Sequence, residues 1–272
     1  MKPWHLWGIR SALLTALLGF WLVASANEQL RFFIGDPMQV AQRLWSWLSA
    51  GGGSLLVELP GAQPFTLQFP GPLYPHLLVT LAETLAALAI GVATGLLAGL
   101  WLGLNPTSAD ILAPFIKAAN AVPRVVLAPL FILWYGLGMT SKIALGISLV
   151  FFTVFFNVMQ GVREVSPALL CNLRLMGANR WQLIRLLYLP SATGWVFSSL
   201  NAVTGLAFVG VVVGEYLGST RGIGYLILQA EATFDVNTVV AGIMVLMICA
   251  LCLDGFFGWF ERRAQAWRRA DL

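Results

Sequence analysis

The chain has 272 residues, of which 58% are hydrophobic and only 10% are charged, against about 45–50% and 25% in an average soluble domain. A soluble fold of this size needs a polar shell, whereas a protein in a bilayer replaces most of that shell with lipid contact. The net charge of +4 does not indicate nucleic-acid binding, because the basic residues stand in small groups between long apolar runs. We therefore expect a membrane protein.

Six apolar segments are long enough to cross a bilayer as helices, which takes about 20 residues each. The third segment is interrupted by Lys117, Pro123 and Arg124. We therefore expect a short interfacial helix over residues 110–121, with a break at Pro123, before that span. The predicted fold class is all-α, a polytopic membrane protein with spans at residues 8–26, 77–104, 118–137, 142–161, 193–217 and 237–259.

The distribution of lysine and arginine predicts the orientation. With the N-terminus inside, ten of these residues lie in inner connections and four in outer ones, while Lys117 and Arg124 remain unassigned. The positive-inside rule then places both termini in the cytoplasm. The first span also resembles a cleavable signal peptide, because Ala24-Ser25-Ala26 follows its apolar run. We favour a retained helix, since its removal would leave five spans and reverse the loop charges.

The predicted domains are residues 1–76, a first helix with a periplasmic loop, and residues 77–272, a core of five transmembrane helices with a cytoplasmic loop at 162–190. In the outer loop, Asp36-Pro37 is expected to begin an amphipathic helix that lies in the membrane interface. The glycine run 51–53 and the following prolines indicate an irregular loop beyond it. A covering flap is favoured over a binding element for this loop.

The loop at 162–190 carries the signals of two short helices. Ser166 suits an N-cap and Pro167 the first position of a helix, and Gly177 suits its C-terminus. Asn179, with Gln182 three residues later, predicts a capping box at the start of a second helix.

Pro190 is expected to close this second helix before the next span. A helix–glycine–helix unit has no membrane-spanning role of its own. The unit is suited to contact a protein in the cytoplasm, and the side chains that would do so are Arg174, Arg180, Trp181 and Arg185.

The spacing of this loop resembles the cytoplasmic motif of ABC-importer permeases: Glu-Ala-Ala, three residues, Gly, nine residues, an aliphatic, any residue, Leu-Pro. Residues at its fixed positions are Gly177, Leu187, Leu189 and Pro190. The resemblance extends over roughly residues 77–269, and further segments resemble the nitrate, sulfonate and taurine branch of these permeases. The other segments that carry it are Arg124 to Lys142, Gly214-Glu215-Tyr216, Gly222-Ile223-Gly224-Tyr225, Asp254 and Glu261-Arg262-Arg263.

The resemblance implies a multi-pass permease of the bacterial inner membrane that translocates a small solute, such as a sulfonate, taurine or nitrate anion, by alternating access. It implies cytoplasmic ABC ATPase subunits, a second permease subunit in a homodimer, and a periplasmic solute-binding protein as partners. The chain has no Gly-x-x-x-x-Gly-Lys-Ser/Thr sequence, so ATP and Mg are expected on the ATPase subunit. We expect no cofactor, metal site or catalytic residue on this chain. An ion-coupled secondary transporter is the alternative.

In one respect the sequence departs from the family. Cys171-Asn172-Leu173 stands where the motif has Glu-Ala-Ala, so docking on the ATPase is expected to depend on shape and on Arg174 and Arg180. The missing acid puts the affinity for the ATPase in question. The residues that the resemblance assigns to ATPase coupling are Cys171, Arg174, Gly177, Ala178, Asn179, Arg180, Trp181 and Pro190.

Small residues recur every four positions along the second span. They form a ridge that lets another helix approach closely, in the same subunit or across a dimer. The ridge consists of Gly91, Gly95, Gly99 and Gly103, preceded by Ala87.

Polar residues of the fifth span fall within one sector at about 100° per residue. A polar face is costly toward lipid, so it is expected to line the translocation pathway, with Asn157 of the fourth span as a contributor. Alternatively, Glu215 is a structural acid near the outer interface, bonded to the terminus of a neighbouring helix. Glu83 of the second span is expected to be hydrated near the outer interface. The sector contains Asn201, Thr204, Phe208 and Glu215.

Overall fold

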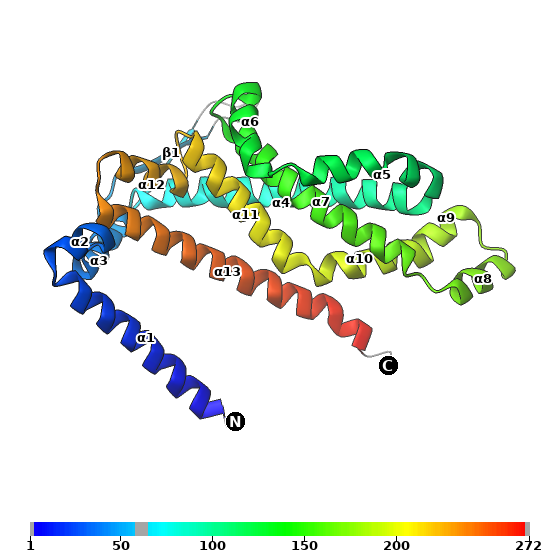
Figure 1. The fold of residues 1–272 in the computed structure, drawn as a ribbon, viewed down its shortest axis with the longest axis horizontal. Helices are drawn as coiled ribbons and strands as arrows, with labels where there is room; N and C mark the ends of the chain where they lie inside the picture. The colour runs from blue at the N-terminus through cyan, green and yellow to red at the C-terminus, as the bar shows by residue number, and fades with distance from the viewer. Residues whose placement is uncertain (1–2, 58–64, 270–272) are drawn as a thin grey trace. The chain divides into compact units, whose positions relative to one another are not determined.

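The computed structural model describes residues 3–57 and 65–269. It confirms the all-α class, with one small hairpin between helices, and Figure 1 traces the elements along the chain. The chain forms two compact units, Met1–Leu78 with Arg221–Met247, and Val79–Thr220 with Ile248–Leu272. The long helices α4 (Leu73–Leu104) and α13 (Val236–Arg269) each contribute to both units.

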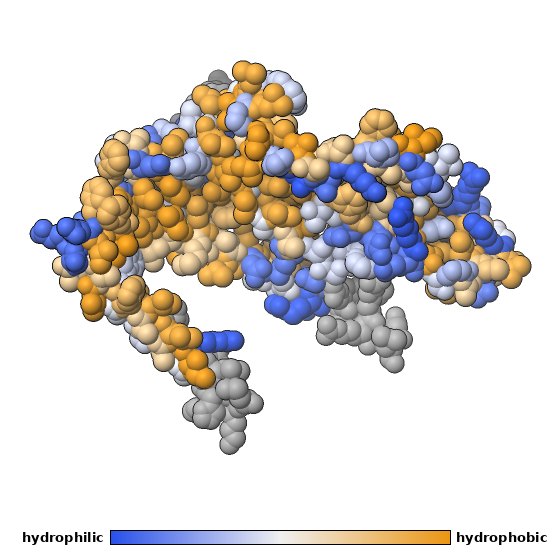
Figure 2. All heavy atoms as spheres, in the orientation of Figure 1, coloured by the Kyte–Doolittle hydropathy of each residue, from blue (hydrophilic) through white to orange (hydrophobic). Residues whose placement is uncertain are grey.

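Five helices in the described part of the chain are long and apolar enough to cross a membrane, and a bent pair of helices makes a sixth crossing if it is one span. Many of their apolar side chains remain exposed, as lipid contact requires, and α1 (Pro3–Ser25) is the clearest case. Its Leu17, Phe20 and Val23 are 64%, 74% and 75% exposed. Figure 2 shows an apolar surface along α1. The five single helices are Gly8–Ser25, Leu73–Leu104, Met139–Arg163, Leu200–Leu217 and Val236–Arg263.

The bent pair corresponds to the third predicted span. Helix α5 (Pro106–Ala121) is followed by a 3-10 turn, Arg124–Leu127, and by α6 (Ala128–Tyr135), with a bend of 82°. The predicted break at Pro123 is confirmed. It arises because Val122 adopts the extended conformation that a following proline favours. The helix before the break begins at Pro106 and not at residue 110.

The first unit contains α2 (Glu28–Ile34), α3 (Pro37–Ser49) and α12 (Ile223–Ala232) besides α1. The predicted start of α3 is confirmed, because the Asp36 side chain accepts a 2.9 Å hydrogen bond from the backbone N–H of Met38. Helix α3 buries Val40 and exposes Trp45. This division of apolar side chains fits a helix that lies in a membrane interface.

The prediction of an irregular loop after α3 is wrong for two segments. Strands β1 (Gly53–Val57) and β2 (Phe65–Phe69) pair antiparallel, with Gly53 opposite Phe69. The alternating apolar residues of β2, and the short apolar run Leu55–Val57 of β1, outweigh the neighbouring glycines and prolines. Pro60 and Pro64 lie outside the described residues.

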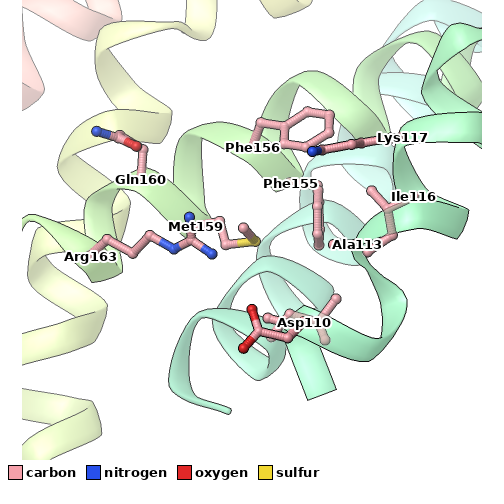
Figure 3. Close-up of a pocket in the computed structure, with 11 residues that line it drawn as sticks. Asp110, Ala113, Ile116, Lys117, Phe155, Phe156, Met159, Gln160 and Arg163 are labelled. Atoms are coloured by element: carbon pink, nitrogen blue, oxygen red, sulfur yellow. The ribbon is translucent and has the colours of Figure 1, made fainter. Parts of the chain in front are cut away.

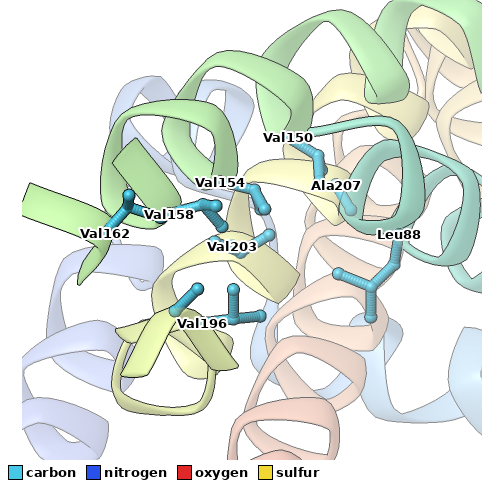
Figure 4. Packing of buried hydrophobic residues seen from close by; sticks show 9 residues of the cluster. Leu88, Val150, Val154, Val158, Val162, Val196, Val203 and Ala207 are labelled. Atoms are coloured by element: carbon cyan, nitrogen blue, oxygen red, sulfur yellow. The ribbon is translucent and has the colours of Figure 1, made fainter. Parts of the chain in front are cut away.

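The core of the second unit joins α4, α7 (Met139–Arg163), α10 (Leu189–Ser198) and α11 (Leu200–Leu217). A row of valines on α7 is its centre, as Figure 4 shows. Because lipid is as apolar as these side chains, close van der Waals packing and not exclusion of water must hold the helices together. The buried cluster contains Leu88, Val150, Val154, Val158, Val162, Ala192, Val196, Val203 and Ala207.

The glycine ridge of α4 packs against this row of valines. A Cβ atom on Gly95 would lie 2.9 Å from the carbonyl oxygen of Phe151, and one on Gly99 would lie 2.8 Å from that of Phe155. A Cβ atom on Gly91 would lie 2.6 Å from the side chain of Val150, and one on Gly103 would lie 2.9 Å from that of Val162. The helix that faces the ridge is therefore α7 of the same subunit.

Candidate functional site

The loop between α7 and α10 contains two short helices, α8 (Pro167–Leu175) and α9 (Arg180–Leu183). Helix α8 ends as predicted at Gly177, whose φ of 81° is a conformation that glycine adopts at little cost. The backbone N–H of Gly177 donates to the carbonyl of Arg174 at 3.0 Å, and that of Ala178 to the carbonyl of Leu173 at 3.0 Å. Gly177 thus reverses the chain between the two helices.

The predicted capping box of α9 is present. The backbone N–H of Gln182 donates to Oδ1 of Asn179 at 2.8 Å, and the backbone N–H of Asn179 donates to Oε1 of Gln182 at 2.8 Å. Ser166 occupies the N-cap position of α8 with Pro167 after it, but the Ser166 side chain makes no capping hydrogen bond. The direction of α9 is therefore fixed by its own first turn.

Pro190 does not close the second helix, contrary to the prediction. Helix α9 continues through a π-helical turn, Ile184–Tyr188, directly into α10, which has Pro190 in its first turn. A π turn inserts an extra residue and relaxes the bonding that a proline would otherwise disrupt. The loop is consequently joined to the next span without a break in the helical path.

The base of the loop is held by contacts between α7 and α10. The hydroxyl of Ser191 donates to the carbonyl oxygen of Gly161 at 2.7 Å. A Cβ atom on Gly161 would lie 2.8 Å from Trp195 and 3.0 Å from the Cα of Ala192, so the two helices touch at the backbone here. A force applied to the loop would be transmitted to both helices.

The tip of the loop exposes large apolar side chains around Gly177. Leu175, Met176 and Trp181 are 81%, 82% and 69% exposed. Arg174 and Arg180 beside them are also exposed, and neither belongs to the two ion pairs found among the described residues. An exposed apolar cluster rimmed by charge is typical of a protein-contact surface. Cys171, at the position of the motif's acid, is exposed on α8.

A second group of polar residues lies buried between α4, α7 and α11. Glu215 and Thr80 are fully buried, and the hydroxyl of Thr80 donates to Oε1 of Glu215 at 2.7 Å. Lys142 is 3% exposed and its Nζ donates to the carbonyl oxygen of Leu137 at 2.7 Å. The structural interpretation of Glu215, an acid bonded to a neighbouring helix, is consistent with this arrangement.

The expectation that Glu83 is hydrated is wrong. Its side chain is fully buried, and neither carboxylate oxygen has a hydrogen-bond partner of ordinary geometry among the described residues. Glu83 lies close enough to Glu215 and Lys142 for direct electrostatic interaction. Glu83 is the seventh residue of the predicted span 77–104, and nothing in the sequence indicates that other helices cover it. An ionisable residue within a span is nevertheless a reason to examine a site. Sequence reasoning missed Thr80 and Lys142 as members of the same group.

The other residues of the predicted polar sector are placed separately from Glu215. Asn201, Thr204 and Phe208 line a cavity of 40 Å³ together with Asp254 of α13. The hydroxyl of Thr204 donates to the carbonyl of Leu200 at 2.8 Å, within its own helix. Asn157 lies half-buried on α7 and lines neither group. Among the described residues, no cluster of His, Cys, Asp and Glu could hold a metal ion.

Known proteins resemble this chain along most of its length. The family model described as "Binding-protein-dependent transport system inner membrane component" matches residues 91–266. The taurine transport system permease protein of Escherichia coli (strain K12) is 29% identical over 96% of this chain and 88% of its own length. The riboflavin transport system permease protein of Chloroflexus aurantiacus is 32% identical over 93% and 88%.

A solved structure shares the fold. The inward-facing MetNI methionine ABC transporter superposes with a TM-score of 0.62 at 18% identity, over 70% of this chain and 95% of that chain. This likeness concerns the fold alone. Members of the matched family are transport subunits without catalytic activity. The chain belongs to the family of binding-protein-dependent transport system inner membrane components and is a permease subunit of an ABC importer.

Proposed function

We propose that this subunit carries a small organic anion, of the sulfonate, taurine or nitrate kind, across the inner membrane by alternating access driven by a separate ATPase subunit. The observation that carries the ATP-driven part is the tip of the loop at Gly177. It exposes Leu175, Met176 and Trp181 beside Arg174 and Arg180. Such a surface is stable in water only at a cost, which a protein partner in the cytoplasm would remove.

The proposed coupling uses the continuous path from the loop into the membrane. Closure of the ATPase dimer on ATP and Mg would displace α8 and α9, and the π-helical turn with the Ser191–Gly161 contact would pass this displacement to α10 and α7. ATP can bias the permease only if its two conformations differ in affinity for the closed ATPase dimer. The loop is therefore proposed to fit one conformation of the ATPase better than the other.

The proposed assembly contains two copies of this subunit, two ATPase subunits and a periplasmic binding protein that delivers the solute. The sector of α11 with Asn201, Thr204, Phe208 and Glu215, and Asn157 of α7, is proposed to contribute to the pathway. Thr204, Phe208 and Glu215 are buried against neighbouring helices in this conformation. They would reach the solute only when α11 separates from those helices, which alternating access requires.

The solute class is supported by the likeness to a taurine permease and by the resemblance to the nitrate, sulfonate and taurine branch. The permease for riboflavin among the relatives shows that the family does not fix the solute.

Substitutions at Gly177 test the docking proposal with little effect on packing, because a Cβ atom there would meet nothing within 4 Å. Valine cannot hold the positive φ without strain, whereas asparagine tolerates it. Gly177→Val should therefore reduce co-purification of the ATPase and ATP-driven uptake, and Gly177→Asn should retain both. If Gly177→Val and a Trp181→Ala variant both co-purified as much ATPase as the wild type does, the loop would have no docking role.

A further inference from the structure

A cavity of 370 Å³ lies between α5 and α7 in the second unit (Figure 3). This volume is in the range of pockets that bind small molecules. Its walls are mainly apolar, and Phe155 at its base is 2% exposed. The apolar residues that line it are Leu102, Ala109, Ala113, Ile116, Phe155, Phe156 and Met159.

Three charged side chains stand at the edges of this cavity. Lys117 and Asp110 come from α5, and Arg163 is the last residue of α7. None of the three forms an ion pair or a side-chain hydrogen bond with any residue that the structure describes. Two cations and one carboxylate leave one positive charge to be neutralised at the rim of an apolar cavity. An anion is the complement of that charge.

The positions of the three charged side chains limit the shape of an anion that could bind in the cavity. Asp110 and Lys117 are seven residues apart on α5, which is about 10 Å along a helix. Figure 3 shows Asp110 and Lys117 at separate ends of the cavity, with the guanidinium of Arg163 directed toward Met159. The apolar wall between these charges would contact a short aliphatic stem.

A further cation, Arg124, packs against α7 one helical turn from the cavity wall, without lining the cavity itself. The guanidinium carbon of Arg124 is 4.7 Å from the ring centroid of Phe152, and Phe152 lies one helical turn before Phe156 of the cavity wall. Arg124 stands at the break between α5 and α6. Interrupted helices are among the places where transporters bind their solutes.

We propose that the cavity between α5 and α7 is a binding site for a small organic oxyanion with an aliphatic stem, such as an alkanesulfonate. Lys117 and Arg163 contact the oxyanion, the aromatic and methionine side chains contact the stem, and Asp110 contacts an ammonium group where the solute has one. That this ligand is the transported solute rests on the proposed function. A phospholipid offers similar chemistry, but its two long acyl chains would need far more than 370 Å³.

The test uses the complete complex of permease and ATPase in lipid nanodiscs. Ethanesulfonate and taurine are the probes, because they differ only in the ammonium group of taurine, and their binding is measured by calorimetry. Lys117→Gln and Arg163→Gln should each weaken both probes by about tenfold or more, as expected for the loss of a charged hydrogen bond. Asp110→Asn should weaken taurine alone.

Arg263→Gln is the matched control, since it removes a cation from a spanning helix outside the cavity. It should leave both affinities unchanged, and thermal unfolding should show that all four variants fold. The inference is overturned if the wild-type complex binds neither probe, if the cavity variants bind like the wild type, or if mass spectrometry finds a phospholipid that only the cavity variants lose. Uptake of the probes is measured separately. Binding without uptake would overturn the proposed function and leave the cavity as a binding site. Uptake without binding would support the proposed function and overturn the cavity as a binding site.

Discussion

The hydroxyl of Thr80 on α4 donates a 2.7 Å hydrogen bond to Oε1 of Glu215 on α11, and both side chains are fully buried. Thr80→Val keeps the shape of the side chain and removes this donor. A buried carboxylate that loses a hydrogen bond costs about 1–3 kcal/mol. The melting temperature of the purified subunit should therefore fall.

Thr84→Val is the control for this change, because Thr84 is equally buried and, among the described residues, its hydroxyl bonds only to the Thr80 carbonyl of its own helix. It should destabilise the protein less than Thr80→Val. Equal melting temperatures for the two variants would show that the bond to Glu215 contributes little.

The contact between the glycine ridge and α7 predicts a second pair of variants. Gly99→Ala places a Cβ atom 2.8 Å from the Phe155 carbonyl oxygen, so the helices must move apart. Such overpacking costs about 1–3 kcal/mol. Fluorescence-detected size-exclusion chromatography should show less folded protein.

Gly205→Ala on α11 is the matched control, because a Cβ atom there meets nothing within 4 Å. Its yield of folded protein should equal or exceed that of the wild type, since alanine favours helix over glycine. If Gly99→Ala folded equally well, α4 and α7 would not be in contact along the ridge.

The attachment of α3 in the first unit predicts a dependence on pH. Arg43 forms a 2.9 Å ion pair with Asp235, just before α13. Partial burial acts to raise the pKa of Asp235, but hydrogen bonds from Thr238 and the charge of Arg43 outweigh it, so the pKa lies below its ordinary value. Because the folded-state pKa is lowered, ionised Asp235 stabilises the attachment of α3. This stabilisation is complete above the ordinary aspartate pKa of about 3.9 and is lost as the pH falls below that value.

Hydrogen exchange of α3 measures this attachment. Exchange should be faster in Asp235→Asn than in the wild type at neutral pH, and the difference should disappear at low pH. A difference that persisted at low pH would assign the effect to something other than the charge of Asp235.

Features that depend on neighbouring residues in the sequence could be predicted. The capping box of Asn179 and Gln182, the reversal at Gly177 and the break at Pro123 each follow from local backbone chemistry. The π-helical turn before Pro190 could not be predicted, because no periodic signal distinguishes it from an α-helix that ends at a proline.

Features that depend on which helix covers a face could not be predicted. The four-residue period showed that Gly95 and Gly99 share one side of α4, but not that α7 packs there. For the same reason the burial of Glu83 and Lys142 was missed, since an apolar run with one charge does not show whether lipid, water or another helix surrounds that charge. The cavity between α5 and α7 likewise depends on the approach of two helices whose contact no sequence period predicts.

The most direct test of the account uses Cys171, which is exposed on α8 where the family motif has its acid. With Cys249 and Cys252 replaced by serine, Cys171 is the one remaining thiol of the chain. A cleavable cross-linker on Cys171 in the assembled complex should capture the ATPase subunit, and a membrane-impermeant maleimide should not label Cys171 in intact cells. Labelling of Cys171 from outside the cell, with no cross-link to the ATPase, would contradict the proposal that this loop couples the permease to ATP.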